Sequence, residues 1–281
     1  MAEALPIAWL NGRLLPIAEA RISPLDRGFL FADAVYEMIP AYAGRPLLLD
    51  AHLARLGRSL AALQIPDPLD EAGWKQLLQS LIDANGGGDL AIYLQVSRGA
   101  DTGRDHLPPA ALEPTVFAMA TRAPPPAGAI AAITASDERW AHCDIKSTGL
   151  LANVLARARA EAAGAREAIL LRDGWLTEGA SSSVIVVVGG TLLRRPGGPE
   201  VLPGTTTDLV VRLADEAGYR CRQEPVSEAR LRAADEIWIT SAMRGVAAVV
   251  RLDGEPVGSG EPGPVWQTVA AMYEDYKYGR R

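Results

Sequence analysis

Alternating apolar and polar residues predict strands and helices across the first 121 positions. Residues 7–9 and 13–15 flank Asn11-Gly12, a dipeptide that favours the tight turn of a β-hairpin. Alternation predicts further strands, whereas leucines three or four residues apart predict amphipathic helices. The expected strands are 34–42, 47–49, 90–98 and 115–121, and the expected helices are one that follows Asp50 as its N-cap and one over 69–84. Residues 23–28 are expected to form a turn-rich loop.

A proline-rich stretch over 122–128 is the expected linker to a second domain. The same rules of alternation and spacing apply beyond it. The expected strands are 129–135, 168–171, 184–188, 191–194, 236–240 and 246–252, and the expected helices end near 164 or cover 205–218, 229–234 and 266–276. This mixture of strands and helices favours the α+β class, with an N-terminal domain over 1–121 and a C-terminal domain over 129–281.

Composition and charge narrow the possible functions. With 281 residues, 48% of them hydrophobic, the chain is long enough for two domains with substantial cores. A net charge of −6 argues against nucleic acid as a partner. Two cysteines and three scattered histidines form neither a disulfide framework nor a metal-ligand pattern, so no metal is expected. No signal-peptide pattern and no apolar run of transmembrane length are found, so we expect a cytoplasmic protein that does not bind membranes.

Lys146 is the candidate centre of the chemistry. Three of the 28 Lys and Arg residues are lysines, so the chain uses arginine almost wherever it needs a cation. A lysine amine, unlike a guanidinium, can lose its proton and attack a carbonyl. Lys75 falls in the polar part of a helix pattern and Lys277 near the C-terminus, whereas Lys146 stands between apolar segments. The alternative interpretation is a solvated loop lysine.

Three further features carry candidate chemistry. Residues 202–208 place threonines and free N–H groups at a helix start, which suits a phosphate, although an ordinary threonine N-cap is the alternative. Glu178 precedes a glycine and several serines and could hold a cationic ring nitrogen, or it is a turn glutamate in water. Arg55 stands among leucines and could reach an anion, or it is an exposed helix arginine. An imine-forming lysine, a phosphate cup and a carboxylate for a ring nitrogen are together what pyridoxal 5′-phosphate requires.

Five sequence motifs follow one another along nearly the whole chain. They are Asp26-Arg27-Gly28 with Asp33-Ala34-Val35-Tyr36-Glu37, then His52-Leu53-Ala54-Arg55-Leu56, Asp144-Ile145-Lys146-Ser147, Thr177-Glu178-Gly179, and Leu202-Pro203-Gly204-Thr205-Thr206. In this order they resemble the class IV (fold type IV) pyridoxal-phosphate aminotransferases. Arg139-Trp140 before the lysine, and Arg104-Asp105-His106 in an open loop, resemble the D-amino-acid transaminase branch. The resemblance implies a smaller N-terminal α/β domain and a larger C-terminal domain with a barrel-like sheet.

The resemblance also implies a role for each candidate residue. Lys146 would bind the cofactor as a Schiff base and shuttle protons, and Glu178 would pair with the pyridine nitrogen. The phosphate and the ring would be held by Arg55, Leu202, Thr205, Thr206, Ser241 and Ala242. Ala242 stands where related enzymes often carry a threonine, so one phosphate hydrogen bond is lost or Arg244 compensates for it.

Substrate binding follows from the same resemblance. Tyr36, Arg104 and His106 would bind the α-carboxylate of a small amino donor or keto acid. The site would lie between the two domains, and the loop with Arg104 would come from the other subunit of a homodimer. The two substrates would react in two successive half-reactions, which gives ping-pong kinetics. We therefore expect transamination of D-amino acids such as D-alanine or D-glutamate.

Other activities of the same fold remain open. A branched-chain L-amino-acid aminotransferase would present the carboxylate to backbone amides instead of Arg104 and His106. An aminodeoxychorismate lyase would use the same lysine for elimination, and an (R)-amine transaminase requires Arg104 to swing away. From a different class, a non-catalytic phosphate-binding homologue would bind the chromophore without turnover.

Overall fold

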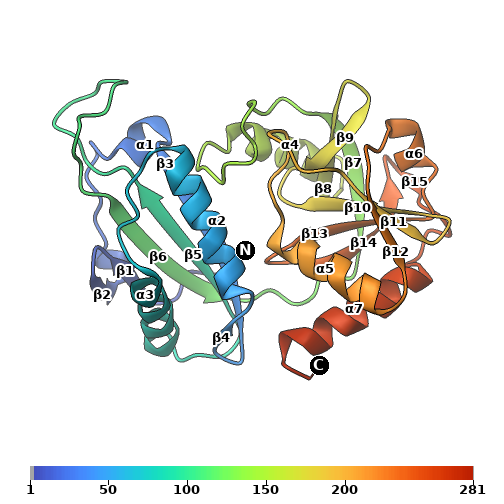
Figure 1. Ribbon diagram of the computed structural model, residues 1–281, viewed down its shortest axis with the longest axis horizontal. Helices are drawn as coiled ribbons and strands as arrows, with labels where there is room; N and C mark the ends of the chain where they lie inside the picture. The colour runs from blue at the N-terminus through green and yellow to red at the C-terminus, as the bar shows by residue number, and fades with distance from the viewer. Residues whose placement is uncertain (1–2, 281) are drawn as a thin grey trace. The chain divides into compact units, whose positions relative to one another are not determined.

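The computed structural model describes residues 3–280, which form two compact units (Figure 1). The first unit ends at Pro124 and also includes Ile145–Gly149, whereas the second contains Pro125–Asp144 and the chain from Leu150 onward. The boundary at Pro124 falls inside the expected linker, but the sequence analysis assigned 145–149 to the second domain. Positions 1, 2 and 281 of the expected domains lie outside the described residues.

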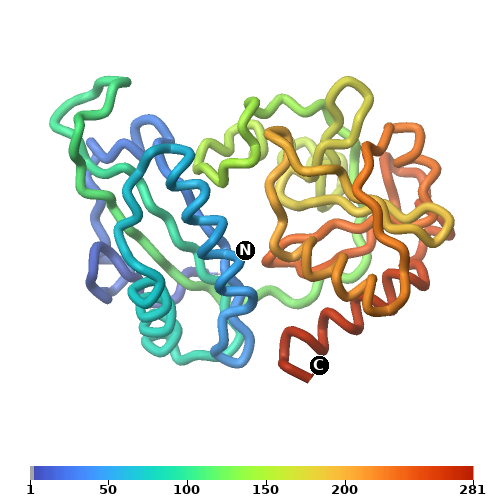
Figure 2. The backbone as a smooth tube through the Cα atoms, in the orientation of Figure 1, coloured from blue at the N-terminus to red at the C-terminus, as the bar shows by residue number. Residues whose placement is uncertain are grey.

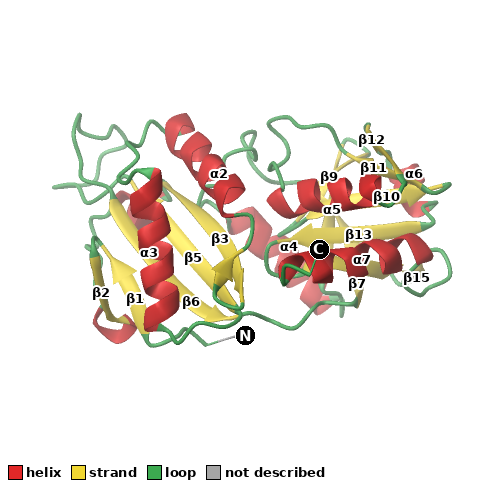
Figure 3. Ribbon diagram, turned by 60° about the horizontal axis from the view of Figure 1, so that its bottom comes forward, coloured by secondary structure: helices red, strands yellow, loops and turns green. Residues whose placement is uncertain are grey.

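The first unit is built on an antiparallel sheet with helices on one face. Within residues 3–124 the sheet has six strands in the order β2-β1-β6-β5-β3-β4. They are β1 (Ile7–Leu10), β2 (Arg13–Pro16), β3 (Ala34–Tyr42), β4 (Arg45–Pro46), β5 (Leu90–Ser97) and β6 (Thr115–Arg122). The helices are a 3-10 turn (Ile17–Glu19), α1 (Arg27–Phe31), α2 (Leu49–Ala62) and α3 (Glu71–Ala84). Figure 3 shows α2 and α3 over the sheet, and their buried leucines form the core with the sheet's inner face.

Local backbone geometry in this unit confirms one expectation and corrects two. Asn11 and Gly12 both have a positive φ, as the expected tight hairpin turn requires. The expected strand at 47–49 is wrong, because Leu48 takes a left-handed φ of 55° and α2 begins at Leu49. Asp50 therefore lies inside the first helical turn and is not the N-cap. The expected loop at 23–28 passes into α1, which begins where Asp26 accepts a hydrogen bond from the Gly28 N–H (2.8 Å).

The second unit is built on a mixed sheet. In its described part the sheet has nine strands, in the order β12-β11-β10-β13-β14-β7-β8-β9 with β15 paired to β14. The β14–β7, β7–β8 and β11–β12 pairs are parallel, and the other pairs are antiparallel. The strands are β7 (Ala129–Ser136), β8 (Glu167–Arg172), β9 (Trp175–Gly179), β10 (Ser183–Val188), β11 (Thr191–Arg194), β12 (Arg220–Gln223), β13 (Glu236–Ser241), β14 (Gly245–Leu252) and β15 (Glu255–Pro256).

Helices complete the second unit. They are α4 (Leu151–Ala162), α5 (Thr205–Glu216), α6 (Glu228–Arg232) and α7 (Pro264–Lys277), and Figure 3 shows α5 and α7 side by side. The strands β9, β12 and β15 were not predicted from the sequence. The strand β12 lies at the edge of the sheet and has charged residues where a typical strand has apolar ones. It is a strand because its backbone pairs with β11. No helix among the described residues is long and apolar enough to cross a membrane.

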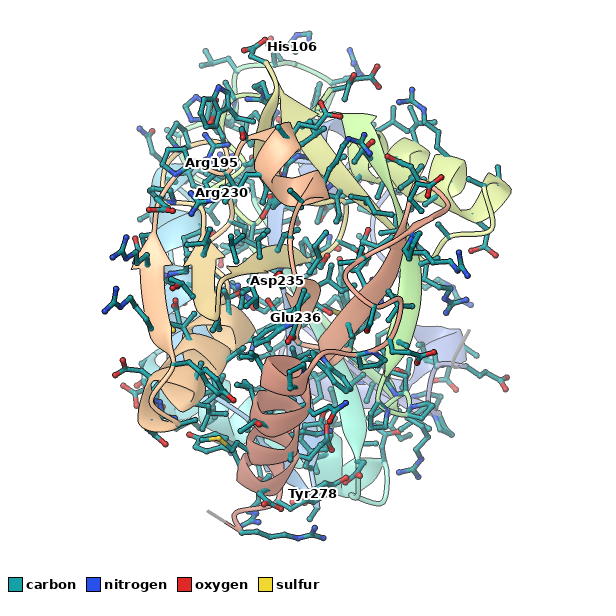
Figure 4. All side chains as sticks on the ribbon, turned by 90° about the vertical axis from the view of Figure 1, so that its right-hand side faces the viewer. His106, Arg195, Arg230, Asp235, Glu236 and Tyr278 are labelled. Atoms are coloured by element: carbon teal, nitrogen blue, oxygen red, sulfur yellow. The ribbon has the colours of Figure 1, made fainter. Side chains whose placement is uncertain are left out.

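Glu236 connects the sheet of the second unit to its last helix. Figure 4 shows Glu236 near the first turn of α7. Its carboxylate accepts hydrogen bonds from the backbone N–H groups of Val265 (3.0 Å) and Trp266 (2.9 Å). The indole N–H of Trp238 is a third donor (2.9 Å). A buried carboxylate from β13 thus satisfies N–H groups that a helix start otherwise leaves unpaired.

Candidate active site

Lys146 lies beside β3 in the first unit. Its carbonyl accepts a hydrogen bond from the Tyr36 N–H (2.9 Å), and Ser147 forms a β-bridge with Val35. The Lys146 N–H donates to the hydroxyl of buried Ser59 (3.2 Å). Its Nζ lies 4.2 Å from the centre of the Tyr36 ring. Lys146 is therefore half-buried on an aromatic face and is not a solvated loop lysine.

The Tyr36 ring also contacts Tyr93, which the sequence analysis missed. The two ring centres are 5.6 Å apart, and the Tyr93 hydroxyl donates to the Gln95 side chain (2.6 Å). Burial, with a smaller contribution from Tyr36, raises the pKa of Tyr93 to about 12. Tyr93 thus stays a neutral phenol beside Tyr36. The strand register that brings β3 and β5 together decides this contact, and the sequence carries no signal for it.

Arg55 is buried in the first unit and paired with Glu37. Its Nε and Nη2 donate to the two carboxylate oxygens of Glu37 (2.8 and 2.7 Å), and His52 Nδ1 lies 2.8 Å from the same carboxylate. Burial raises the pKa of Glu37, but hydrogen bonds from Arg55 and His52 outweigh it and lower the pKa to about 2. Burial lowers the pKa of His52, and Glu37 offsets part of this effect. The alternative of an exposed helix arginine is wrong, because Arg55 is 5% exposed.

Arg104 and His106 lie in the loop between β5 and β6, which extends beyond the end of the sheet (Figure 2). The guanidinium carbon of Arg104 is 4.8 Å from the centre of the Phe31 ring. The centre of the His106 ring is 5.4 Å from the same Phe31 ring centre. One aromatic side chain thus contacts both residues that were expected to bind a carboxylate. Tyr36, the third expected member, contacts Lys146 and Tyr93 instead of Phe31.

Glu178 is a buried carboxylate of the second unit, near the end of β9. It forms an ion pair with Arg139 and accepts a hydrogen bond from the Leu202 N–H (3.1 Å). The structure thus brings Glu178 and Leu202 together, and the alternative of a turn glutamate in water is wrong. Arg139 also pairs with Asp137 (2.8 Å). Burial raises the pKa of Asp137, but Arg139 lowers it by more, so this pKa lies below its usual value. This role of Arg139 was not predicted from the sequence.

The N-terminus of α5 carries buried threonines and a glycine that has no room for a side chain. Gly204 is the N-cap residue, so the alternative of a threonine N-cap is wrong. A Cβ at Gly204 would lie 2.4 Å from the Thr207 hydroxyl and 2.7 Å from the Ser183 hydroxyl. Thr207 is already hydrogen-bonded to Thr240 (2.7 Å), whereas the Thr206 hydroxyl has no hydrogen-bond partner among residues 3–280. The first turn of α5 therefore offers N–H groups and a hydroxyl to an anion.

Arg244 is engaged within the second unit. It donates to Glu167 (2.6 Å) and to the Arg166 carbonyl (3.2 Å), and its own N–H donates to the Ser241 hydroxyl (3.2 Å). Glu167 is fully buried and also accepts hydrogen bonds from the hydroxyls of Ser181 and Ser182. This carboxylate therefore joins the turn at Ser241 to the serines that follow Glu178.

The roles of Glu37 and Glu167 were likewise not predicted from the sequence. Each is a glutamate within or beside an apolar strand pattern. A charge in such a place is costly to bury unless it is paired, so this pattern is the signal that could have identified both.

The chain is similar to known proteins in sequence and in fold. Residues 34–252 match the family described as amino-transferase class IV. A D-alanine aminotransferase of Bacillus licheniformis is 41% identical over 269 residues, covering 94% of this chain and 95% of that protein. A D-alanine aminotransferase of Staphylococcus aureus (strain MW2) is 32% identical over 272 residues, covering 95% of this chain and 96% of that protein.

Solved structures of similar fold include branched-chain amino acid aminotransferases. The T.th. enzyme, complexed with N-(5′-phosphopyridoxyl)-L-glutamate, has a TM-score of 0.90 at 26% identity and covers 99% of this chain and 95% of its own. The enzyme of Escherichia coli has a TM-score of 0.89 at 25% identity and covers 96% of this chain and 94% of its own.

Proposed function

The chain belongs to the class IV aminotransferases, and from this premise we propose that it transfers amino groups between D-amino acids and 2-keto acids. D-alanine and D-glutamate are the proposed donors. The observation that carries this proposal is the 41% identity to a D-alanine aminotransferase across 94% of the chain. The two solved branched-chain enzymes described above are 25–26% identical.

Enzymes of this class use pyridoxal 5′-phosphate, which when bound supplies an electron sink for the carbon that loses its proton. The residues of this chain fit that group. The first turn of α5, with Gly204 and the Thr206 hydroxyl, suits its phosphate. Buried Arg55, which Glu37 holds through two hydrogen bonds, is the proposed cation for a phosphate. Buried Glu178 suits the ring nitrogen, and the Ser241 turn with Ala242 is the proposed second phosphate contact.

Lys146 is the proposed catalytic residue. Its Nζ would hold the cofactor covalently, and the freed amine of Lys146 would act as the base that takes the α-proton of the donor. The neighbouring Tyr36 ring and the backbone bond to β3 limit where the lysine can move. Glu178 holds a proton at the ring nitrogen, and its pairing with Arg139 and Leu202 keeps the carboxylate in one orientation.

Arg104, with His106 and Tyr36, binds the α-carboxylate of the substrate in this proposal. A guanidinium can bind a carboxylate through two parallel hydrogen bonds. The position of the carboxylate decides which face of the α-carbon meets Lys146, so it also decides the enantiomer. An Arg104→Ala variant is therefore expected to lower kcat/KM for D-alanine by about 10²–10³-fold.

A branched-chain L-amino-acid aminotransferase is the second candidate, because the solved structures of similar fold carry that name. In such an enzyme Arg104 would not bind the α-carboxylate. A wild type that prefers L-leucine, with an Arg104→Ala variant of unchanged activity, would favour this candidate.

We also propose a homodimer in the cytoplasm. Leu151, Val154 and Leu155 lie on one face of α4 and are all exposed, Leu151 by 72%. An apolar face of this kind is typical of a protein–protein interface. The two cysteines, Cys143 and Cys221, are free thiols, which is compatible with a reducing compartment.

Two measurements test the function. A panel of D- and L-amino acids, with pyruvate and 2-oxoglutarate as acceptors, should show turnover of D-alanine or D-glutamate and little turnover of L-leucine. Borohydride reduction followed by peptide mapping should place the cofactor on Lys146. An adduct on Lys75 or Lys277 would contradict the assignment, and an absence of transamination with every donor would contradict the function.

A further inference from the structure

We infer that Arg27 and Phe31 form a brace that positions Arg104 and His106 and thereby sets the preference of the enzyme for donors with an α-carboxylate. This inference rests on the proposed function, because it assigns carboxylate binding to Arg104 and His106. Arg27 and Phe31 are positioning residues, since they contact the loop and not the reacting atoms. The brace is defined by these two side chains of α1.

Arg27 connects to both ends of the segment that carries Arg104. At one end, its backbone N–H donates to the carbonyl of Gly99 (2.9 Å). At the other end, its Nη1 donates to the carbonyl of Asp105 (2.7 Å) and its Nη2 to the carbonyl of His106 (2.9 Å). One guanidinium therefore holds the carbonyls of the two residues that follow Arg104. This fixes the position of the loop backbone from which the Arg104 and His106 side chains extend.

Burial makes this connection rigid. Arg27 is 3% exposed, although it lies in a helix of five residues at the base of an open loop. Its Nε donates to the carboxylate of Asp33 (2.9 Å), and Asp101 lies 3.6 Å from Nη1. A lysine carries a single nitrogen and cannot reproduce this forked set of bonds to one carboxylate and two carbonyls. Arg27→Lys thus keeps the charge and removes the geometry.

Phe31 positions the side chains themselves. The guanidinium carbons of Arg27 and Arg104 lie 4.7 and 4.8 Å from the centre of its ring, and the His106 ring packs at 5.4 Å. A cation on an aromatic face and a tilted ring pair both favour particular side-chain orientations. Because Arg104 and His106 are otherwise exposed, this ring restricts rotamers that solvent would leave free.

The chain provides a matched control for Arg27. Arg98 donates to the same Asp33 carboxylate (2.7 and 3.0 Å), but its other bonds go to the carbonyls of Leu63 and Gln64. It therefore shares the ion pair of Arg27 and does not hold the carbonyls beside Arg104. A difference between Arg27→Lys and Arg98→Lys isolates the contribution of the brace.

The test compares D-alanine with D-alaninamide, which has nearly the same size and lacks the carboxylate. Single-turnover reactions of the holoenzyme with each compound, followed by the absorbance of the cofactor, give a maximal rate and an apparent binding constant. Arg27→Lys and Phe31→Leu should weaken apparent binding of D-alanine by about 10–100-fold and leave the D-alaninamide reaction within about twofold of wild type. Arg98→Lys should behave as wild type with both compounds, and Phe31→Tyr, which keeps the ring, should retain D-alanine binding.

Equal losses with both compounds would overturn the inference, because they would show a merely structural role. The inference would also be overturned if the ratio of the apparent binding constants for D-alanine and D-alaninamide were the same in Arg27→Lys, Arg98→Lys and wild type. If Arg27→Lys does not fold, the Phe31→Leu and Phe31→Tyr pair decides the question by itself. A wild type that reacts with no D-amino acid would instead contradict the proposed function, so the two failures are distinguishable.

Discussion

Replacing Glu37 with glutamine tests the buried ion pair that holds Arg55. The substitution keeps the volume of the side chain and removes its charge. Glu37 is fully buried and accepts two hydrogen bonds from Arg55, and His52 lies at hydrogen-bond distance. We expect Glu37→Gln to destabilise the protein, because it removes the carboxylate charge that is paired with the buried Arg55 cation.

Two independent estimates of the magnitude agree. Removing one partner of a buried ion pair costs about 3–5 kcal/mol of folding free energy. Burial opposes the ionised carboxylate, but Arg55 and His52 bring the pKa of Glu37 from 4.5 down to about 2. At about 1.4 kcal/mol per pKa unit, the difference between 4.5 and about 2 is worth roughly 3–4 kcal/mol. Because the folded pKa is lowered, the contribution is fully present above pH 4.5 and is lost as the pH falls to about 2.

Urea unfolding of the holoenzyme, followed by circular dichroism at several pH values, measures this effect. At pH 7 the free energy of unfolding of Glu37→Gln should be about 3 kcal/mol or more below that of wild type. The difference should shrink as the pH falls below 4.5, since the wild-type carboxylate then takes up its own proton. Glu71→Gln is the matched control, because Glu71 forms an exposed pair with Lys75 (2.6 Å) and should matter by less than about 1 kcal/mol. Equal stabilities of the two variants, or a difference that does not change with pH, would refute the reasoning.

Three further predictions concern the second unit and its assembly. Glu178→Gln should still bind the cofactor but slow its single-turnover conversion by D-alanine about 10²-fold, and a wild-type rate would show that the ring nitrogen is held otherwise. Glu236→Ala should lower the free energy of unfolding by roughly 2–4 kcal/mol in urea titrations, because three donors lose their acceptor. The control is Glu255→Ala, at an exposed position, and an equally small change in Glu236→Ala would contradict the capping role. Leu155→Glu places a charge on the apolar face of α4 and should convert the proposed dimer to monomer in analytical ultracentrifugation. A dimer that persists in this variant would place the interface elsewhere.

The similarity of the chain to class IV aminotransferases confirms the expected family, the α+β fold, the enzymatic function and the cofactor. The sequence sufficed for these because they depend on residue types at characteristic spacings. Lys146 is one of three lysines in a chain with 25 arginines. The Gly204-Thr205-Thr206 run predicts the start of a helix without any knowledge of where the helix packs. The roles of the individual site residues stay proposals.

Local chemistry also determined several elements. The Asn11-Gly12 turn is one example, because its backbone preference acts within four residues. The expected strand at 47–49 failed for the complementary reason. Leucines suit either a strand or a helix, and the left-handed turn at Leu48 gave the following residues to α2.

The long-range partners of several buried charged residues were decided by the tertiary structure alone. Glu37 lies 18 positions before Arg55, and Arg27 lies 78 positions before the Asp105 carbonyl that it binds. Sequence patterns describe which face of an element is apolar, but not which distant element supplies the counter-charge for a buried group. The partner is determined by strand order and register, because these decide which distant segments lie beside a buried charge. A buried charge is costly unless one of those segments pairs with it.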